Sequence, residues 1–133
     1  MTTPHPIPTS LAIVDPRLDL ARVAADVARE IRPNIPIGVF AELNEGEAWI
    51  AQADGPVLLL ADVSVMDDFA LGEMREWSMP EGHMSMIAMF DGTQVFEEDR
   101  AHAIAGDDVL MKPTRLGDWR TALPKYLGPK STD

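Results

Sequence analysis

Three charged residues of the sequence have side chains and positions that suit chemistry: Asp15, Asp62 and Lys112. Each directly follows a run of apolar residues: Leu11–Val14, Val57–Ala61 and Val109–Met111. Two carboxylates from neighbouring strands could bind a divalent cation through oxygen, and a lysine could neutralise a phosphoryl group. The residue types therefore indicate a site that handles phosphate.

Each of the three residues also has a structural interpretation. Asp15 precedes Pro16, and aspartate followed by proline is a common start of a helix, so Asp15 could cap the first helix. Lys112 could simply extend from the edge of a sheet with its ammonium group in water. Asp62 is the hardest to explain in this way, because a carboxylate after five apolar residues is costly to bury without a partner or a function.

Segments of two kinds alternate along the chain and must position these residues. The apolar runs predict five strands, at Leu11–Val14, Ile35–Phe40, Val57–Ala61, Ser85–Met89 and Val109–Met111. Helical periodicity follows each run, from Asp15–Pro16 to Pro33, over Glu45–Ala53, around Ala70–Trp77, over Glu97–Ile104 and around Leu116–Leu123. This alternation predicts an α/β fold with a parallel sheet and helices on both faces. In such sheets ligands bind at the carboxyl ends of the strands, where the three charged residues stand.

Length and composition exclude several classes of function. The chain has 133 residues, 46% of them hydrophobic, which is enough for one core. We expect a flexible lead over 1–10, one domain over 11–127 and a tail over 128–133. A net charge of -11 argues against binding to nucleic acid or to anionic membranes. The absence of cysteine excludes thiolate zinc sites, and the lack of a secretory signal or membrane-spanning run predicts a cytoplasmic protein.

The most specific motif is Gly106–Pro113, which reads Gly-Asp-Asp-Val-Leu-Met-Lys-Pro. It resembles the Gly-Ala-Asp-Asp-Tyr-Leu-x-Lys-Pro stretch of receiver domains in two-component response regulators, with one residue missing. The apolar segments ending in Asp15 and Asp62, and the stretch Glu97–Ala101, resemble the same domain, so that the likeness covers about 11–127. The resemblance implies the flavodoxin-like (βα)5 receiver fold, with a five-stranded parallel sheet of order 2-1-3-4-5.

The resemblance also implies roles for individual residues. Asp62 falls on the phosphoacceptor and Lys112 on the phosphate-sensing lysine. Asp15, Asp62 and the backbone carbonyl of Ser64 would hold Mg²⁺. The second acid of the family's metal pocket is replaced here by Pro16, which cannot bind a cation through its side chain, so we expect magnesium to bind weakly or not at all.

Two further departures concern the family's switch. The hydroxyl residue at the end of the fourth strand is replaced by Phe90, and the aromatic residue three places before the lysine is Val109. The coupled movement of a hydroxyl and a ring has therefore lost both of its side chains. These two positions predict a phosphorylation switch that is impaired or absent.

Three hypotheses for function follow. The first is an atypical receiver, a pseudo-receiver without enzymatic activity, that signals through contacts with a histidine kinase or another signalling protein. The second is a phosphoprotein whose Asp62 is phosphorylated by a histidine kinase. The third is a flavodoxin-like binding domain unrelated to signalling, since fold does not fix function. Mixed charges also suggest a weak homodimer through the fourth helix, fifth strand and fifth helix, at Asp99, Arg100, Asp107, Asp108, Arg115, Asp118 and Arg120.

Overall fold

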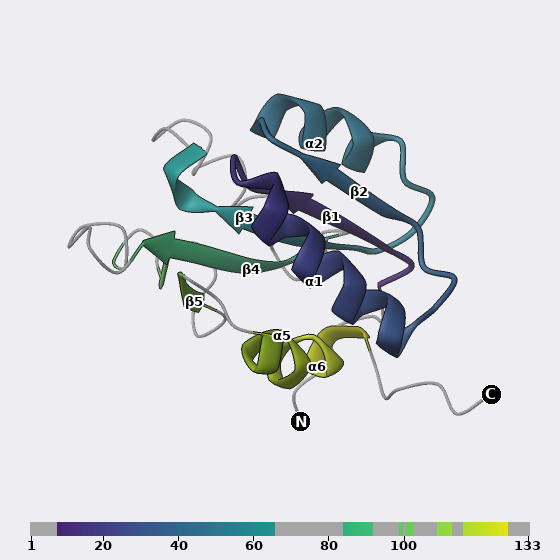
Figure 1. Ribbon diagram of the computed structural model, residues 1–133. Helices are drawn as coiled ribbons and strands as arrows, with labels where there is room; N and C mark the ends of the chain where they lie inside the picture. Colours follow the sequence, from purple (N-terminus) through teal and green to yellow (C-terminus); the bar gives the residue numbers. More distant parts are fainter. Residues whose placement is uncertain are drawn as a thin grey trace, which may run out of the picture.

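Five parallel strands form a single sheet in the order β2-β1-β3-β4-β5 (Figure 1). The computed structural model describes residues 8–65, 84–91, 99, 101–102, 109–112 and 116–127. The strands are β1 (Ser10–Val14), β2 (Ile37–Phe40), β3 (Val57–Asp62), β4 (Met84–Asp91) and β5 (Val109–Lys112). The predicted fold class and strand order are confirmed.

The helices lie on both faces of this sheet, as expected. Their bounds are α1 (Leu18–Ile31), α2 (Leu43–Ala51), the short 3-10 helix η1 (Val63–Val65), α5 (Leu116–Ala122) and α6 (Pro124–Leu127). Alternate residues of each strand point to opposite faces, so Leu11 and Ile13 of β1 pack with α1 and α5, whereas Ala12 and Val14 pack with α2. Figure 1 shows α1, α5 and α6 together on one side of the sheet.

The central strands β1 and β3 are buried along their whole length. Each of these strands has a neighbouring strand on both sides and helices over both faces. Side chains on both faces are therefore buried, which explains the uninterrupted apolar sequences. The register sets Val14 of β1 beside Ala61 of β3, and Asp62 beside Met89 of β4. The ends of these strands therefore meet at one edge of the sheet.

The first helix begins later than the sequence predicts. Asp15 does not cap it: α1 begins at Leu18, and its N-cap residue is Arg17, which makes no capping hydrogen bond through its side chain. The Asp15 carboxylate instead accepts a hydrogen bond from the Arg17 backbone N–H at 2.9 Å. The Asp15 carboxylate is therefore used in a local turn and is not available to cap the helix, which starts after the turn.

Two other helix boundaries also differ from the predictions. The helix expected over Glu45–Ala53 begins at Leu43 and ends at Ala51, because the buried face runs from Leu43 to Ile50. The final helix is two helices, α5 and α6, and the second begins at Pro124, which has no N–H to continue the hydrogen bonds of the first.

Parts of the predicted organisation lie outside the described residues. These are the helix around Ala70–Trp77, most of Glu97–Ile104, the first seven residues and the tail over 128–133. Of the expected lead, Ser10 already belongs to β1, and the backbone N–H of Thr9 donates to the Pro56 carbonyl at 2.8 Å. No helix within the described residues is long and apolar enough to cross a membrane.

Candidate functional site

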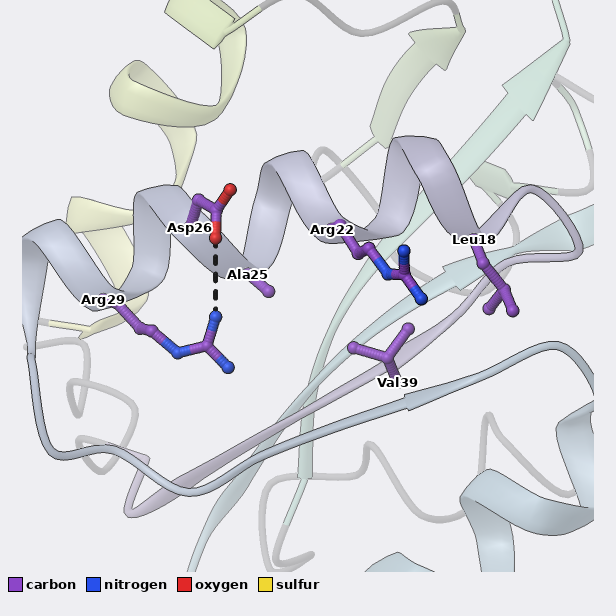
Figure 2. A pocket seen from close by; sticks show the side chains of 6 residues that line it. All are labelled: Leu18, Arg22, Ala25, Asp26, Arg29 and Val39. Atoms are coloured by element: carbon purple, nitrogen blue, oxygen red, sulfur yellow. Dashed lines mark hydrogen bonds and ion pairs between the residues drawn. The ribbon is translucent and has the colours of Figure 1, made fainter.

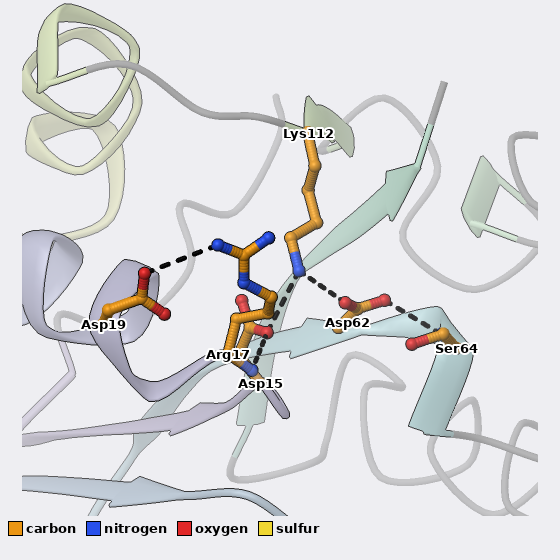
Figure 3. A network of polar contacts seen from close by, with 6 residues as sticks. All are labelled: Asp15, Arg17, Asp19, Asp62, Ser64 and Lys112. Carbon is orange, nitrogen blue, oxygen red and sulfur yellow. Dashed lines mark hydrogen bonds and ion pairs between the residues drawn. The ribbon is translucent and has the colours of Figure 1, made fainter. Parts of the chain in front are cut away.

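The three predicted charged residues come together at the carboxyl edge of the sheet (Figure 3). Asp15 directly follows β1, Asp62 is the last residue of β3, and Lys112 is the last residue of β5. In the register, Lys112 lies beside Asp91 of β4, which separates β5 from β3. The long lysine side chain therefore spans the width of β4 to reach the carboxylates.

The ammonium group of Lys112 contacts both carboxylates. Its Nζ lies 2.6 Å from Oδ2 of Asp62 and 3.0 Å from Oδ1 of Asp15. The three side chains are nearly inaccessible, with 11% of Lys112, 7% of Asp62 and 2% of Asp15 exposed. One positive charge thus neutralises part of two negative charges in a buried position, where the pairing is strong because water screens it little.

Backbone N–H groups fix the orientation of each carboxylate. Ser64 N–H donates to Oδ1 of Asp62 at 2.9 Å, across the start of η1. Arg17 N–H donates to Oδ1 of Asp15, also at 2.9 Å. Each bond joins a carboxylate to the residue two places further along the chain, which is the geometry of an Asx turn. The turns that follow β1 and β3 therefore hold both carboxylates toward Lys112.

The surroundings of Lys112 favour its charged form. Burial alone lowers the pKa of the ammonium group, but hydrogen bonds to Asp62 and Asp15 and the charges of the two carboxylates outweigh it. The net result is a pKa above the ordinary lysine value. Lys112 is consequently a permanent cation at this site over the physiological range.

The predicted magnesium ligands, Asp15, Asp62 and Ser64, lie together at this edge of the sheet. Mg²⁺ is usually bound through one or two carboxylates, with water completing its shell, and the carboxylates of Asp15 and Asp62 both face Lys112 here. Both of these carboxylates hydrogen-bond to Lys112, and the Ser64 N–H, rather than the carbonyl predicted as a ligand, donates to Asp62. The ammonium group is the cation that joins the carboxylates in this arrangement.

The two predicted switch positions meet in one apolar cluster. Phe90 is buried together with Val63, Ala88 and Ala101, and Val109 packs against this cluster. Val63 directly follows Asp62, so the cluster lies beside the site and reaches to β5. Neither side chain carries a polar group, so neither can hydrogen-bond to a ligand held at Asp62.

Sequence reasoning missed Arg17, a second cation at the rim of the site. Its guanidinium group is exposed and lies 3.4 Å from the Asp19 carboxylate (Figure 3), and its backbone N–H is the group that donates to Asp15. The signal in the sequence is its place beside Pro16, which stands where a second acid is expected after the first apolar strand.

Arg120, expected on a homodimer face, is used within the domain. It donates from Nε and Nη2 to the two carboxylate oxygens of Glu30 in α1, at 3.2 Å and 3.0 Å. This bidentate pair joins α5 to α1. Of the other residues expected on the dimer face, Asp99 and Asp118 are exposed, and the remainder lie outside the described part of the chain.

The fold is that of response-regulator receiver domains. A CheY-like receiver domain from Methanospirillum hungatei superimposes with a TM-score of 0.68 at 17% identity, covering 90% of this chain and 94% of the other. The receiver domain of Ssk1 from Saccharomyces cerevisiae, solved with the histidine phosphotransfer protein Ypd1, gives 0.67 at 14% identity, covering 90% and 89%.

The beryllofluoride-activated receiver domain dimer of NtrC4 gives a TM-score of 0.66 at 16% identity, with 89% of this chain and 96% of that one covered. The sequence matches no family model and no curated protein. The fold implied by the resemblance in Gly106–Pro113 is therefore confirmed by structural similarity, at low sequence identity.

Proposed function

We propose that this chain is an atypical receiver domain that acts in two-component or phosphorelay signalling through contacts with other proteins. In this proposal the phosphorylation switch is impaired or absent. The proposal is supported by the receiver fold, by the convergence of Asp15, Asp62 and Lys112, and by the signalling complexes in which two of the similar domains were solved.

The observation that carries the proposal is the apolar contact between the two switch positions. A receiver responds to phosphate when a polar group near the acceptor moves toward it and a neighbouring side chain follows. Here Phe90 and Val109 pack with Val63 and Ala101, and a phosphoryl group on Asp62 would gain no hydrogen bond from either. A ligand that interacts equally with two states cannot shift their populations. Phosphorylation of Asp62 would therefore leave the conformational equilibrium of the domain unchanged.

Incubation with acetyl phosphate and magnesium tests the proposal directly. We expect intact-protein mass spectrometry to show little or no addition of a phosphoryl group to the wild type. Asp62→Asn serves as the control for modification elsewhere. Complete modification that disappears in Asp62→Asn, together with a change of oligomeric state, would contradict an impaired switch.

The second candidate is a working phosphoacceptor without the standard switch. Two observations favour it: Lys112 Nζ is 2.6 Å from Asp62, where it could neutralise phosphoryl oxygens, and the Ser64 N–H already orients the acceptor carboxylate. Modification of Asp62 by acetyl phosphate with no change in oligomeric state would support this candidate in place of the first.

We also propose a weak homodimer that does not depend on phosphorylation. The face expected to form it carries the exposed acids Asp99 and Asp118, and Arg100 and Arg115 belong to the same segments of the sequence. A two-fold axis can set acidic residues of one copy against basic residues of the other. The similar NtrC4 receiver domain was solved as a dimer, which supports self-association of a domain with this fold.

A further inference from the structure

A groove with a volume of about 370 Å³ lies between α1 and β2, and neither Asp62 nor Lys112 lines it (Figure 2). β2 is an edge strand of the sheet, so the groove opens at the edge opposite β5. Its lining combines apolar side chains with charged ones: Leu18, Arg22, Ala25, Asp26, Arg29 and Val39.

The groove concentrates positive charge on a strongly acidic protein. The whole chain has only 11 lysines and arginines against 22 acidic residues, yet two arginines line this one groove. Arg22 makes no hydrogen bond or ion pair with any described residue. Arg29 contacts Asp26 only at 3.5 Å. The Arg29 side chain is 55% exposed and the Asp26 side chain is 76% exposed.

The spacing of the arginines restricts the ligand. Arg22 and Arg29 are seven residues apart on α1, which corresponds to about 10 Å along the helix axis. Figure 2 shows both guanidinium groups on the side of α1 that faces β2, with Val39 beneath Arg22. One small anion would meet one guanidinium group in this arrangement, whereas two carboxylates about 10 Å apart would meet both.

We propose that this groove binds an extended acidic segment of a partner protein. Two carboxylates of the segment pair with Arg22 and Arg29, and an aliphatic side chain between them covers Val39. In an extended segment of the polyproline II type, residues three positions apart point to the same side and are separated by about 9 Å, which is close to the spacing of the arginines. A short acidic segment complements the two arginines and places less negative charge against the rest of this acidic protein than an anionic membrane would. The inference does not depend on phosphorylation of Asp62.

A fluorescein-labelled peptide with the core Glu-Val-Val-Glu and blocked ends is the probe for this groove. We expect fluorescence anisotropy to show saturable binding to the full chain, weaker at high salt because the contacts are exposed. The double variant Arg22→Gln/Arg29→Gln is expected to bind at least about tenfold more weakly, since it loses two charge-assisted contacts. Lys125→Gln, which removes an exposed cation outside the groove, is the matched control and should bind as the wild type does.

Asp26→Asn tests the same groove in the opposite direction. Its carboxylate repels an acidic ligand and competes for Arg29, so its neutralisation is expected to tighten binding about threefold. Equal binding of a Gln-Val-Val-Gln peptide would overturn the proposal, because recognition would then not depend on charge. It would also be overturned by unchanged binding to the double variant, by no binding to the wild type, or by arginine-dependent binding to phosphatidylserine vesicles in place of the peptide.

Discussion

The Lys112 ammonium nitrogen lies 2.6 Å from Oδ2 of Asp62, and this buried pair organises the carboxyl edge of the sheet. The same nitrogen lies 3.0 Å from Asp15, so one cation serves two carboxylates from two strands. A buried ion pair adds little over apolar packing, but removal of one partner leaves uncompensated charge in a poorly solvated place. Stability should therefore be sensitive to each member of this group, and most of all to the lysine.

Lys112→Met should be strongly destabilising. The variant leaves the carboxylates of Asp15 and Asp62 close together without a cation, and we expect the free energy of unfolding to fall by about 3–5 kcal/mol. Urea unfolding measures this value. Lys125→Met, at an exposed position, is the control and should change stability by less than about 0.5 kcal/mol. Adding Asp62→Asn to Lys112→Met should recover part of the loss, and an equal effect of the two lysine variants would show that the buried pair is unimportant.

Stability should fall at alkaline pH because of the same residue. The pKa of Lys112 is raised above 10.5, the ordinary value, so between 10.5 and the folded-state pKa the native state retains a proton that the unfolded state loses. The stabilisation is complete below 10.5 and is lost as pH rises through the folded-state pKa. Asp62→Asn removes one of the charges that raise this pKa and should show a smaller alkaline loss, measured by urea unfolding at a series of pH values. Identical pH profiles for the two proteins would contradict this assignment.

Gly46 should not tolerate a side chain, although it is in a helix. A Cβ added at Gly46 of α2 would lie 2.6 Å from Cγ2 of Val14, which is fully buried in β1. We expect Gly46→Ala to destabilise the fold by about 1–3 kcal/mol through overpacking. Gly117→Ala in α5 is the matched control, because nothing lies within 4 Å of the added Cβ, and it should stabilise the fold by about 0.5 kcal/mol. A stabilising effect at Gly46 as well would show that α2 does not pack closely on β1.

The proposed homodimer should be sensitive to salt and insensitive to phosphorylation. Sedimentation equilibrium of the wild type is expected to show weak association that decreases as salt is raised, since exposed opposite charges hold the face together. Arg115→Glu should weaken association at low salt. A wild type that stays monomeric at every salt concentration would exclude self-association through this face.

The strands and the convergence of the site could be predicted because they follow from local rules. An uninterrupted apolar run such as Val57–Ala61 fits only a strand covered on both faces, and parallel strands bring their carboxyl ends to one edge. Asp15, Asp62 and Lys112 therefore had to lie near one another. The ion pairs of Lys112 with both carboxylates could not be predicted. They depend on side-chain lengths and distances that the spacing of residues in the sequence does not give.

The details that escaped prediction depend on tertiary contacts. The start of α1 at Leu18 reflects the use of Asp15 by both Arg17 and Lys112, and the second of these is 97 residues away. Arg120 likewise pairs with Glu30, 90 residues earlier in the chain. No local sequence pattern identifies such partners, because the tertiary fold determines which distant residues meet. The arginines of the α1–β2 groove had a visible signal, the spacing of seven residues, but the opposite wall of the groove is visible only in the folded chain.

We propose that the state of Asp62 is not relayed through the apolar cluster around Phe90 to Val109, and amide NMR tests this proposal. Spectra of the ¹⁵N-labelled chain with and without beryllofluoride and magnesium report on each backbone position. We predict no change at the amides of Val109 and Ala101, which belong to the apolar cluster around Phe90. Shifts at both amides that saturate with beryllofluoride and vanish in Asp62→Asn would show that the cluster does relay the state of Asp62.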